Sequence, residues 1–468
     1  MTGSSFITRY VIPGIIGCAL LMQMLDSTVV ATALPAMGEA FGTSAVRMNV
    51  AITSYLLAVA IFVPLSGWAS DRFGARRVFA AAVLLFTLSS VFCALAQSLV
   101  HLVIGRVVQG MAGAMMVPVG RVILLRAVPK SELVRAMSFL TMPALLGPML
   151  GPPLGGFLVT YASWHWIFVV NVPIGLAGLY LIFKYIPDVA ATEPDRPLDL
   201  VGFVLTGLSL AGIVYGVDAI GHNSASNAWA FGILAAGILL GALYVYHARR
   251  SPHPIIDLHL LSIPTFRICT VGGNLSRFAI GATPFLLVML LQEVFGMTAL
   301  AAGMITFVGA VGALVLKIVA VPVLRALGFR TALIINAITT GFFLAVCALF
   351  TPSTPSWLML GVLLVGGFFR SLQLTAVNTL TYADVPHELM SRASTFAAMA
   401  QQVGMSFGVG VAAVTLNLSM LARGVDQLSR FDVGMGFVVV GGLVALSAWF
   451  FMKLDHDAGA EVSGRNRS

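Results

Sequence analysis

One acidic residue stands in a long apolar stretch near the start of the chain, residues 20–37. This residue is Asp26, and its neighbours in that stretch carry no other charge. A charge at the bilayer centre costs about 2.5–3.5 kcal/mol on insertion scales, so such an acid usually marks an ion or proton pathway. In the apolar run 99–123, Arg106 lies about 10 Å from the outer boundary of its span. This depth matches that of Asp26, which lies about 12 Å from the outer boundary. We expect the two to pair, as a proton-coupling site or as a structural ion pair.

Three further cations interrupt apolar runs later in the chain, and no acid lies at their depth. They are Arg277, Lys317 and Arg370, at about 17, 8 and 14 Å from the cytoplasmic ends of their spans. Uncompensated charges cannot face lipid, so a basic, water-filled cavity is expected, with Lys317 alternatively reaching the interface. Such a cavity favours anionic or zwitterionic cargo. The substrate-binding side chains are therefore predicted to be Arg277, Lys317, Arg370, Gln373, Gln109 and Gln23.

The composition requires a membrane setting for these residues. Of 468 residues, 59% are hydrophobic and 9% charged, and the mean hydropathy is +0.98. Apolar runs of about 20 residues, enough to cross ~30 Å as helix, recur along the chain. The predicted class is an all-α polytopic membrane protein with fourteen transmembrane helices: 11–34, 48–69, 77–96, 99–123, 136–160, 165–186, 198–220, 228–248, 266–294, 299–322, 331–351, 356–379, 393–421 and 432–452.

Two longer connections divide these spans into six, two and six. The first, 186–199, is polar and contains prolines, and the second, 247–267, mixes basic residues with an apolar stripe. We expect part of the second to be an amphipathic helix at the membrane surface. The predicted units are a six-helix bundle (1–186), an inserted helix pair with its linkers (187–265), a second six-helix bundle (266–452) and a polar tail (453–468).

The distribution of positive charge predicts the topology. Most of the 26 lysines and arginines fall in segments that are cytoplasmic if the amino terminus is inside, and the outside loops hold Arg47, Arg423 and Arg430. This bias follows the positive-inside rule, and an even span count places both termini in the cytoplasm. The net charge of +8 therefore reflects topology, and no nucleic-acid partner is expected. The first span serves as its own signal anchor.

The loop 67–77, GWASDRFGARR, is the most specific pattern in the chain. Glycine, acid, glycine and paired arginines directly after a span resemble motif A of the major facilitator superfamily. A weak echo, 325–333, follows the tenth span, as a duplicated transporter would require. The segment RVVQG, with Arg106 and Gln109, looks like motif B, whose arginine is implicated in proton coupling. GPMLGPPLGG, 147–156, resembles motif C, the antiporter signature. The resemblance implies gating roles for Gly67, Asp71, Arg72, Gly74, Arg76, Arg77, Gly147, Gly151, Pro152, Gly155 and Gly156.

Residues 25–35 and 164–175 also look like signatures of the fourteen-helix drug:proton antiporter branch. The resemblance implies the major facilitator fold and proton-driven multidrug export across a bacterial inner membrane by alternating access. In that cycle Asp26 takes a proton from outside and releases it inside; desolvation disfavours its charge and Arg106 favours it. A proton-coupled importer of an anionic metabolite is the nearest alternative, and a non-transporting sensor or scaffold is a remote one.

Other functions lack their residues. No phosphate-binding GxxxxGK[ST] or HExxH pattern is present, and the GxSxG match at 404–408 lies inside an apolar run. We expect no enzyme activity, no catalytic residues, no metal and no cofactor, with energy taken from an ion gradient. The expected partners are a small-molecule substrate, protons and the lipid bilayer, and the expected state is a monomer. Whether a periplasmic adaptor takes part is left open.

Overall fold

The computed structural model describes residues 10–43, 48, 50–188, 191–221, 227–425 and 427–463, which form helices and turns and no strand. The predicted outside Arg47 and positions 464–468 of the predicted tail lie outside these residues. The all-α class is confirmed. The helices are α2 (Ile12–Ala40), α4 (Val50–Phe62), α5 (Leu65–Phe73), α6 (Ala75–Ala94), α7 (Leu99–Ala127), α8 (Leu133–Tyr161), α9 (Trp166–Val169), α10 (Asn171–Tyr185), α11 (Leu200–Gly221), α12 (Asn227–Ala248), α13 (Pro264–Val288), α14 (Ala299–Leu327), α15 (Phe329–Val346), α16 (Ser356–Leu380), α17 (Met390–Arg423), α18 (Arg430–Phe451) and α19 (Ala460–Ser463).

The long helices follow the predicted spans in order. Within the described residues, 11 helices are long and apolar enough to cross a membrane, or up to 13 if each of two bent pairs counts as one span. One bent pair is α4 with α5, which meet at 58°. The predicted span 136–160 lies within α8, a helix of 29 residues that is not among those candidates. The count of fourteen therefore stays a prediction.

Two glycines make equivalent turns in the two halves of the chain. Gly74 separates α5 from α6 with a φ of +87°, and Gly328 separates α14 from α15 with a φ of +73°. Only glycine adopts such angles without strain, because a side chain would meet the backbone. The weak sequence similarity between 71–78 and 325–333 thus corresponds to the same type of backbone turn in each half of the chain.

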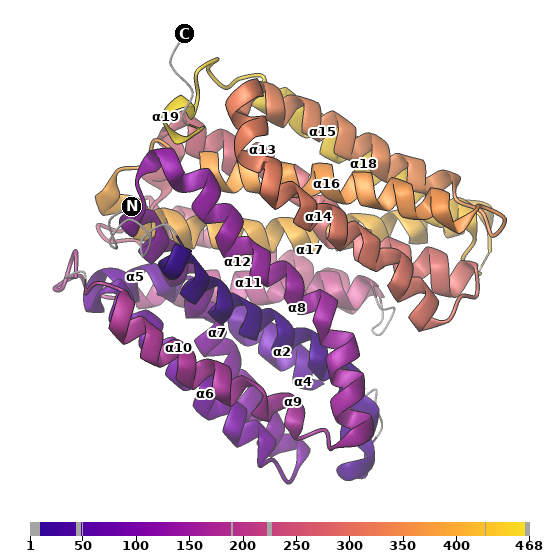
Figure 1. Ribbon diagram of the computed structural model, residues 1–468, viewed down its shortest axis with the longest axis horizontal. Coiled ribbons are helices and arrows are strands. Elements are labelled where there is room, and N and C mark those ends of the chain that lie inside the picture. The colour runs from indigo at the N-terminus through magenta and orange to yellow at the C-terminus, as the bar shows by residue number, and fades with distance from the viewer. Residues whose placement is uncertain are drawn as a thin grey trace.

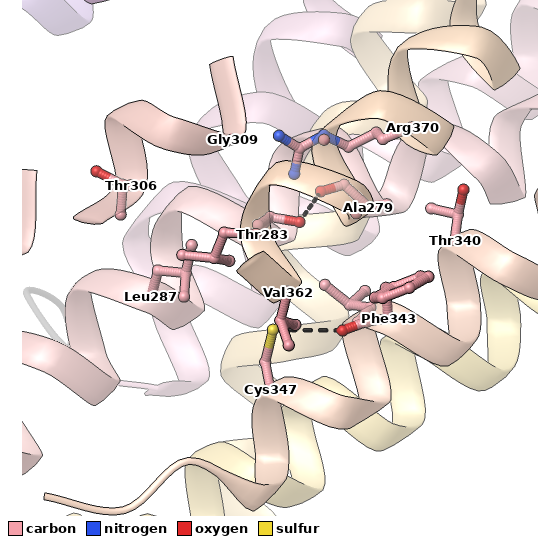
Figure 2. A pocket seen from close by; sticks show the side chains of 14 residues that line it. Ala279, Thr283, Leu287, Thr306, Gly309, Thr340, Phe343, Cys347, Val362 and Arg370 are labelled. Carbon is pink, nitrogen blue, oxygen red and sulfur yellow. Dashed lines mark hydrogen bonds between the residues drawn. The ribbon is translucent and has the colours of Figure 1, made fainter. Parts of the chain in front are cut away.

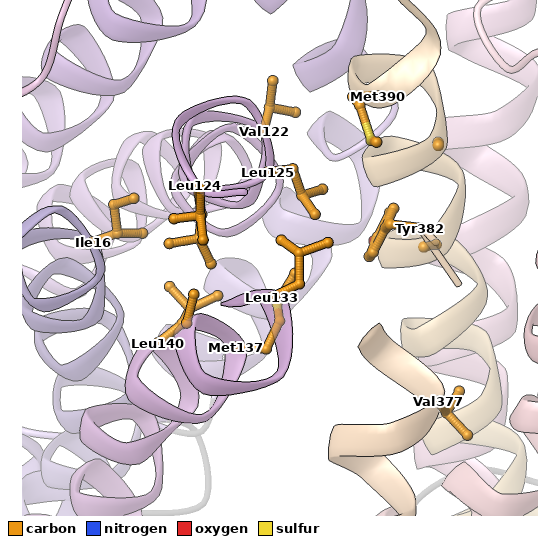
Figure 3. Close-up of a cluster of buried hydrophobic side chains, with 14 of the residues drawn as sticks. Ile16, Val122, Leu124, Leu125, Leu133, Met137, Leu140, Val377, Tyr382 and Met390 are labelled. Atoms are coloured by element: carbon orange, nitrogen blue, oxygen red, sulfur yellow. The ribbon is translucent and has the colours of Figure 1, made fainter. Parts of the chain in front are cut away.

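Two bundles of helices contact each other mainly at one end. Helices α2 to α10 and α13 to α18 spread apart in Figure 1 away from the end where α2 begins and α19 lies. A buried apolar cluster joins the bundles there, with Leu125 and Leu133 facing Tyr382 and Met390 (Figure 3). Two other buried clusters each stay within one bundle. Since α2 starts at this end, it is the predicted cytoplasmic end.

The inserted helices α11 and α12 pack against each other and lie beside both bundles. Helix α11 contacts α4 of the first bundle and α17 of the second. The backbones of α11 and α12 approach closely at Gly212 and Gly237, where a Cβ would lie within about 3 Å of the other helix. The prediction of an amphipathic helix in 247–267 is wrong. That segment holds one short 3₁₀ turn, Leu258–Ser262, because Pro252 and Pro254 disfavour an α-helix.

Candidate functional site

The Asp26 carboxylate lies inside the first bundle and accepts hydrogen bonds on both oxygens. Arg106 Nη1 donates to Oδ2 at 2.6 Å, while Gln109 Nε2 and Asn171 Nδ2 donate to Oδ1 at 3.0 and 2.9 Å. All four side chains are fully buried. Every hydrogen bond at the carboxylate is donated by a neighbouring side chain, and Arg106 supplies the opposite charge.

Arg106 connects three helices around this acid. Its Nε donates to the carbonyl oxygen of Ala51 on α4 at 3.1 Å, and Nη1 also donates to Gln109 Oε1 at 2.6 Å. The guanidinium carbon lies 4.4 Å from the ring centroid of Tyr55, a cation–π distance. The expected pairing of Asp26 with Arg106 is thus present. Any change in the charge of Asp26 acts on the packing of α2, α4 and α7 together.

Two members of the network were not predicted from the sequence. Asn171 begins α10, and Ser90 of α6 accepts a hydrogen bond from Gln109 at 2.8 Å. The signal for Asn171 was its amide within an apolar run, in a segment noted only for its family resemblance. Gln109, predicted to contact substrate, belongs to this network, and its substrate contact stays a prediction. Gln23 lies nearby on α2 and is buried.

The glycines of 147–156 bring α8 against the helix that carries Asp26. A Cβ at Gly151 would lie 2.0 Å from Thr28 Oγ1, and one at Gly155 would lie 2.1 Å from Thr32 Oγ1. A Cβ at Gly147 would lie 2.5 Å from Met24 Cβ, whereas Gly156 has nothing within 4 Å of a Cβ position. Pro152 lies within the same helix. Three of the four predicted glycines therefore set the spacing between α2 and α8.

The segment 67–77, predicted as a loop, instead forms the end of α5, the turn at Gly74 and the start of α6, and it contacts the second bundle and the first linker. Gly67 on α5 faces α17, where a Cβ would lie 2.6 Å from Thr395 Oγ1. Asp71 is buried, with one oxygen 3.7 Å from Arg126 and the other 3.6 Å from Arg196. The arginines of the segment bind nearby groups: Arg72 donates to the Arg196 carbonyl oxygen, Arg76 to the Phe183 carbonyl oxygen, and Arg77 lies 3.5 Å from Asp188.

Both linkers of the inserted helix pair join this segment to α17. On the first linker, Arg196 approaches Asp71, and its neighbour Glu193 pairs with Arg392 of α17. On the second linker, Asp257 Oδ2 accepts a hydrogen bond from Arg392 Nη1 at 3.0 Å. We call Asp71, Glu193, Arg196, Asp257 and Arg392 the linker clasp. It connects the two bundles at the predicted cytoplasmic end.

The electrostatics of Asp257 follow from its place in the clasp. Partial burial opposes its charge, but hydrogen bonds from Arg392 and from His259 outweigh burial and hold the pKa of the Asp257 carboxyl below its usual range. Asp257 is therefore charged at neutral pH and able to pair with Arg392.

The second bundle brings together three of the predicted polar residues. Arg277, Gln373 and Arg370 line one small cavity, and Arg370 also lines a larger cavity of about 40 Å³. Arg277 donates to Asn274 and Asn378, and Gln373 donates to Ser276. Figure 2 shows the Arg370 guanidinium at one end of the larger cavity, with Phe343, Val362 and Cys347 toward the other. Lys317 lines neither cavity and donates to Thr375 at 2.7 Å.

No group of three or more His, Cys, Asp or Glu side chains able to hold a metal ion occurs in the described part of the chain. The polar centres that the structure defines are thus the Asp26 network, the linker clasp and the Arg370 cavities.

Comparison with known sequences yields one family and full-length relatives. The family model described as Major Facilitator Superfamily matches residues 16–255 and 269–467. The chain is 36% identical over 460 residues to the multidrug resistance protein MdtD of Salmonella paratyphi A, covering 97% of each protein. It is 35% identical, with the same coverage, to the protein of that name from Salmonella typhi.

Solved structures agree on the fold. The human organic anion transporter MFSD10 matches with a TM-score of 0.70 at 16% identity, over 96% of this chain and 100% of that one. The proton:xylose symporter XylE matches with a TM-score of 0.65 at 18% identity, over 97% of each chain. At these identities the likeness establishes the arrangement of helices alone.

Proposed function

Because the chain belongs to the major facilitator superfamily and is a membrane transporter, we propose that it is a proton-coupled exporter of amphipathic small molecules. The single observation that carries the proposal is the buried carboxylate of Asp26, paired with Arg106 at 2.6 Å. The MdtD relatives, named for multidrug resistance, support export as the direction. The protein works in a bacterial inner membrane with both termini in the cytoplasm, and it works as a monomer without enzymatic activity.

The physical basis of coupling is the charge balance at Asp26. Protonation of the carboxylate would leave Arg106 charged, buried and without its ionic partner. Removing one partner of a buried pair is unfavourable by about 3–5 kcal/mol, so protonation favours a state in which Arg106 moves or meets water. Because Arg106 also bonds α4, the proton changes the relative stability of two arrangements of α2, α4 and α7.

The second element of the mechanism is the closed contact at the predicted cytoplasmic end. There the apolar cluster and the linker clasp join the bundles, whereas two other large clusters each stay within one bundle. Alternating access would open this contact and close the far end. In our proposal, the proton on Asp26 and the cargo set which end is open.

A test replaces Asp26 by Asn in everted membrane vesicles that hold a proton gradient, with norfloxacin, an amphipathic zwitterion that carries a carboxylate, as the transported probe and a pH-sensitive dye as the reporter. Asp26→Asn preserves the shape of the side chain and removes the exchangeable proton, so norfloxacin-dependent proton release should disappear. Asp432→Asn is the matched control, because Asp432 is also buried and paired with an arginine, Arg423, but lies at the start of α18.

Unchanged coupling in Asp26→Asn would make the Asp26–Arg106 pair structural and refute the proposal. Direction is read separately in right-side-out vesicles. Uptake of the probe driven by an inward proton gradient would indicate the importer alternative in place of export.

A further inference from the structure

The second bundle contains buried cations without acidic partners. Arg277 and Lys317 are almost fully buried and Arg370 is half-buried. Their hydrogen-bond partners are neutral: two asparagines for Arg277 and a threonine for Lys317. In the described part of the chain, no hydrogen bond or ion pair reaches Arg370. A buried charge needs a counter-charge or water to be tolerated. The bundle is therefore incomplete without a ligand or solvent at these positions.

The unsatisfied groups converge on the two cavities that share Arg370. Thr340 also lines both, and its buried hydroxyl has no hydrogen-bond partner among the described residues. Arg277 lines the smaller cavity, and its Nε is likewise buried without a partner there. None of the residues that line either cavity is acidic. Donors and positive charge thus face a space that contains no anion of the protein.

The larger cavity has a polar end and an apolar end. Its volume of about 40 Å³ exceeds the ~10–15 Å³ that one water requires, so it can take a carboxylate group but not a whole drug-sized molecule. Opposite Arg370 the walls are apolar, with Leu287, Val362 and Phe343 (Figure 2). A planar guanidinium matches a carboxylate with two parallel hydrogen bonds.

We propose that these cavities bind the carboxylate group of an organic anion. Arg370 provides the positive charge that pairs with the carboxylate, and Thr340 and Arg277 donate further hydrogen bonds to it. This inference deepens the proposed function, because it names the class of the exported cargo. The apolar part of the anion lies along the wall opposite Arg370 or extends beyond the cavity.

The test measures binding to the purified full-length protein in detergent, with no proton gradient. The probe is benzoate, and benzamide is its neutral counterpart of nearly the same shape. Isothermal titration should give benzoate an affinity at least about tenfold higher than that of benzamide. Arg370→Gln should weaken benzoate about tenfold or more, because it removes hydrogen bonds to a charged group. Arg330→Gln is the matched control, since Arg330 donates a solvent-exposed hydrogen bond to the Met452 carbonyl oxygen in the same bundle and lines neither cavity.

A second measurement avoids dependence on the Arg370 variant. Cys347 lines the larger cavity, so in a protein with Cys18, Cys93 and Cys269 replaced by serine, benzoate should slow alkylation of Cys347 and benzamide should not. Equal affinity for benzoate and benzamide, or unchanged benzoate binding in Arg370→Gln, overturns the proposal. Binding is also measured in Asp26→Asn. Retained benzoate affinity there separates the anion site from proton coupling, so the two proposals can fail independently.

Discussion

Replacing Arg392 by Gln should open the predicted cytoplasmic end of the molecule. Arg392 on α17 pairs with Glu193 and Asp257, which belong to the two linkers of the inserted helix pair. Glutamine keeps most of the length of the side chain and removes its charge. The clasp between α17 and both linkers is then lost, while the apolar cluster beneath it remains.

The size of the effect follows from the exposure of each partner. A hydrogen bond to a charged group contributes about 1.5–3 kcal/mol, and the Asp257 and Arg392 side chains are only 11% and 19% exposed, so this pair is assigned about 1.5 kcal/mol. The Glu193 side chain is 38% exposed, and a screened pair of that kind contributes about 0.5 kcal/mol. The sum is about 2 kcal/mol, or a change of about thirtyfold in the ratio of closed to open molecules.

Thiol labelling at position 394 measures this ratio. Ser394 is fully buried at the contact between the bundles, where its hydroxyl donates to the Pro118 carbonyl oxygen at 2.8 Å. With Ser394→Cys as the only cysteine, Arg392→Gln should raise the labelling rate about thirtyfold, and the control Arg330→Gln should leave it within about twofold. An unchanged rate in Arg392→Gln would refute the reasoning. An equal rise in the labelling rate of the control would show that removal of any positive charge has this effect, independent of the linker clasp.

Two further predictions concern packing and pH. Gly151→Ala should destabilise the protein by about 1–3 kcal/mol through overpacking, because its Cβ would lie 2.0 Å from Thr28 Oγ1, and its melting temperature in detergent should fall. Gly156→Ala should be neutral or stabilising, because a Cβ there meets nothing within 4 Å. Equal melting temperatures of the two variants would contradict the close approach of α2 and α8. Because the pKa of Asp257 is lowered from its ordinary 3.8, its stabilising contribution is complete above that pH and is lost as the pH falls through the lowered value. The melting-temperature difference between the wild type and Asp257→Asn should therefore be constant near neutral pH and shrink only below about pH 4, as the pH falls toward the lowered pKa. A difference that stays constant as the pH falls through this range would count against the pairing.

The centre of the first bundle could be predicted in part from the sequence. An acid and an arginine inside apolar runs, Asp26 and Arg106, were expected to pair because a buried charge needs an opposite charge. Counting residues from the span ends gave the two a matching depth. Neutral partners give no such signal. Asn171 and Ser90 differ little from the many small polar residues of membrane helices. Only the packing of α10 against α2 and of α6 against α7 and α10 brings them into the network.

The linker clasp could not be predicted in the same way. Glu193 and Arg392 are 199 residues apart, and charged loop residues are usually solvated. The order of spans predicts that both lie at the predicted cytoplasmic end, but it gives no preference among the many acids and arginines there. The pairing depends on how α11 lies between α4 and α17, which carries the linkers across the junction of the bundles.

The two halves handle buried charge in opposite ways, and this difference bears on the driving force. In the first half Asp26 and Arg106 neutralise each other, so one proton changes the net charge of that site by one. In the second half Arg370 has no ionic partner among the described residues, so a bound carboxylate would neutralise it. Exchange of one proton for one monoanion moves two elementary charges in the direction that an inside-negative potential favours, about 4.6 kcal/mol at 100 mV. Exchange of one proton for one monocation moves none, so the charge of the cargo decides whether the membrane potential contributes to export.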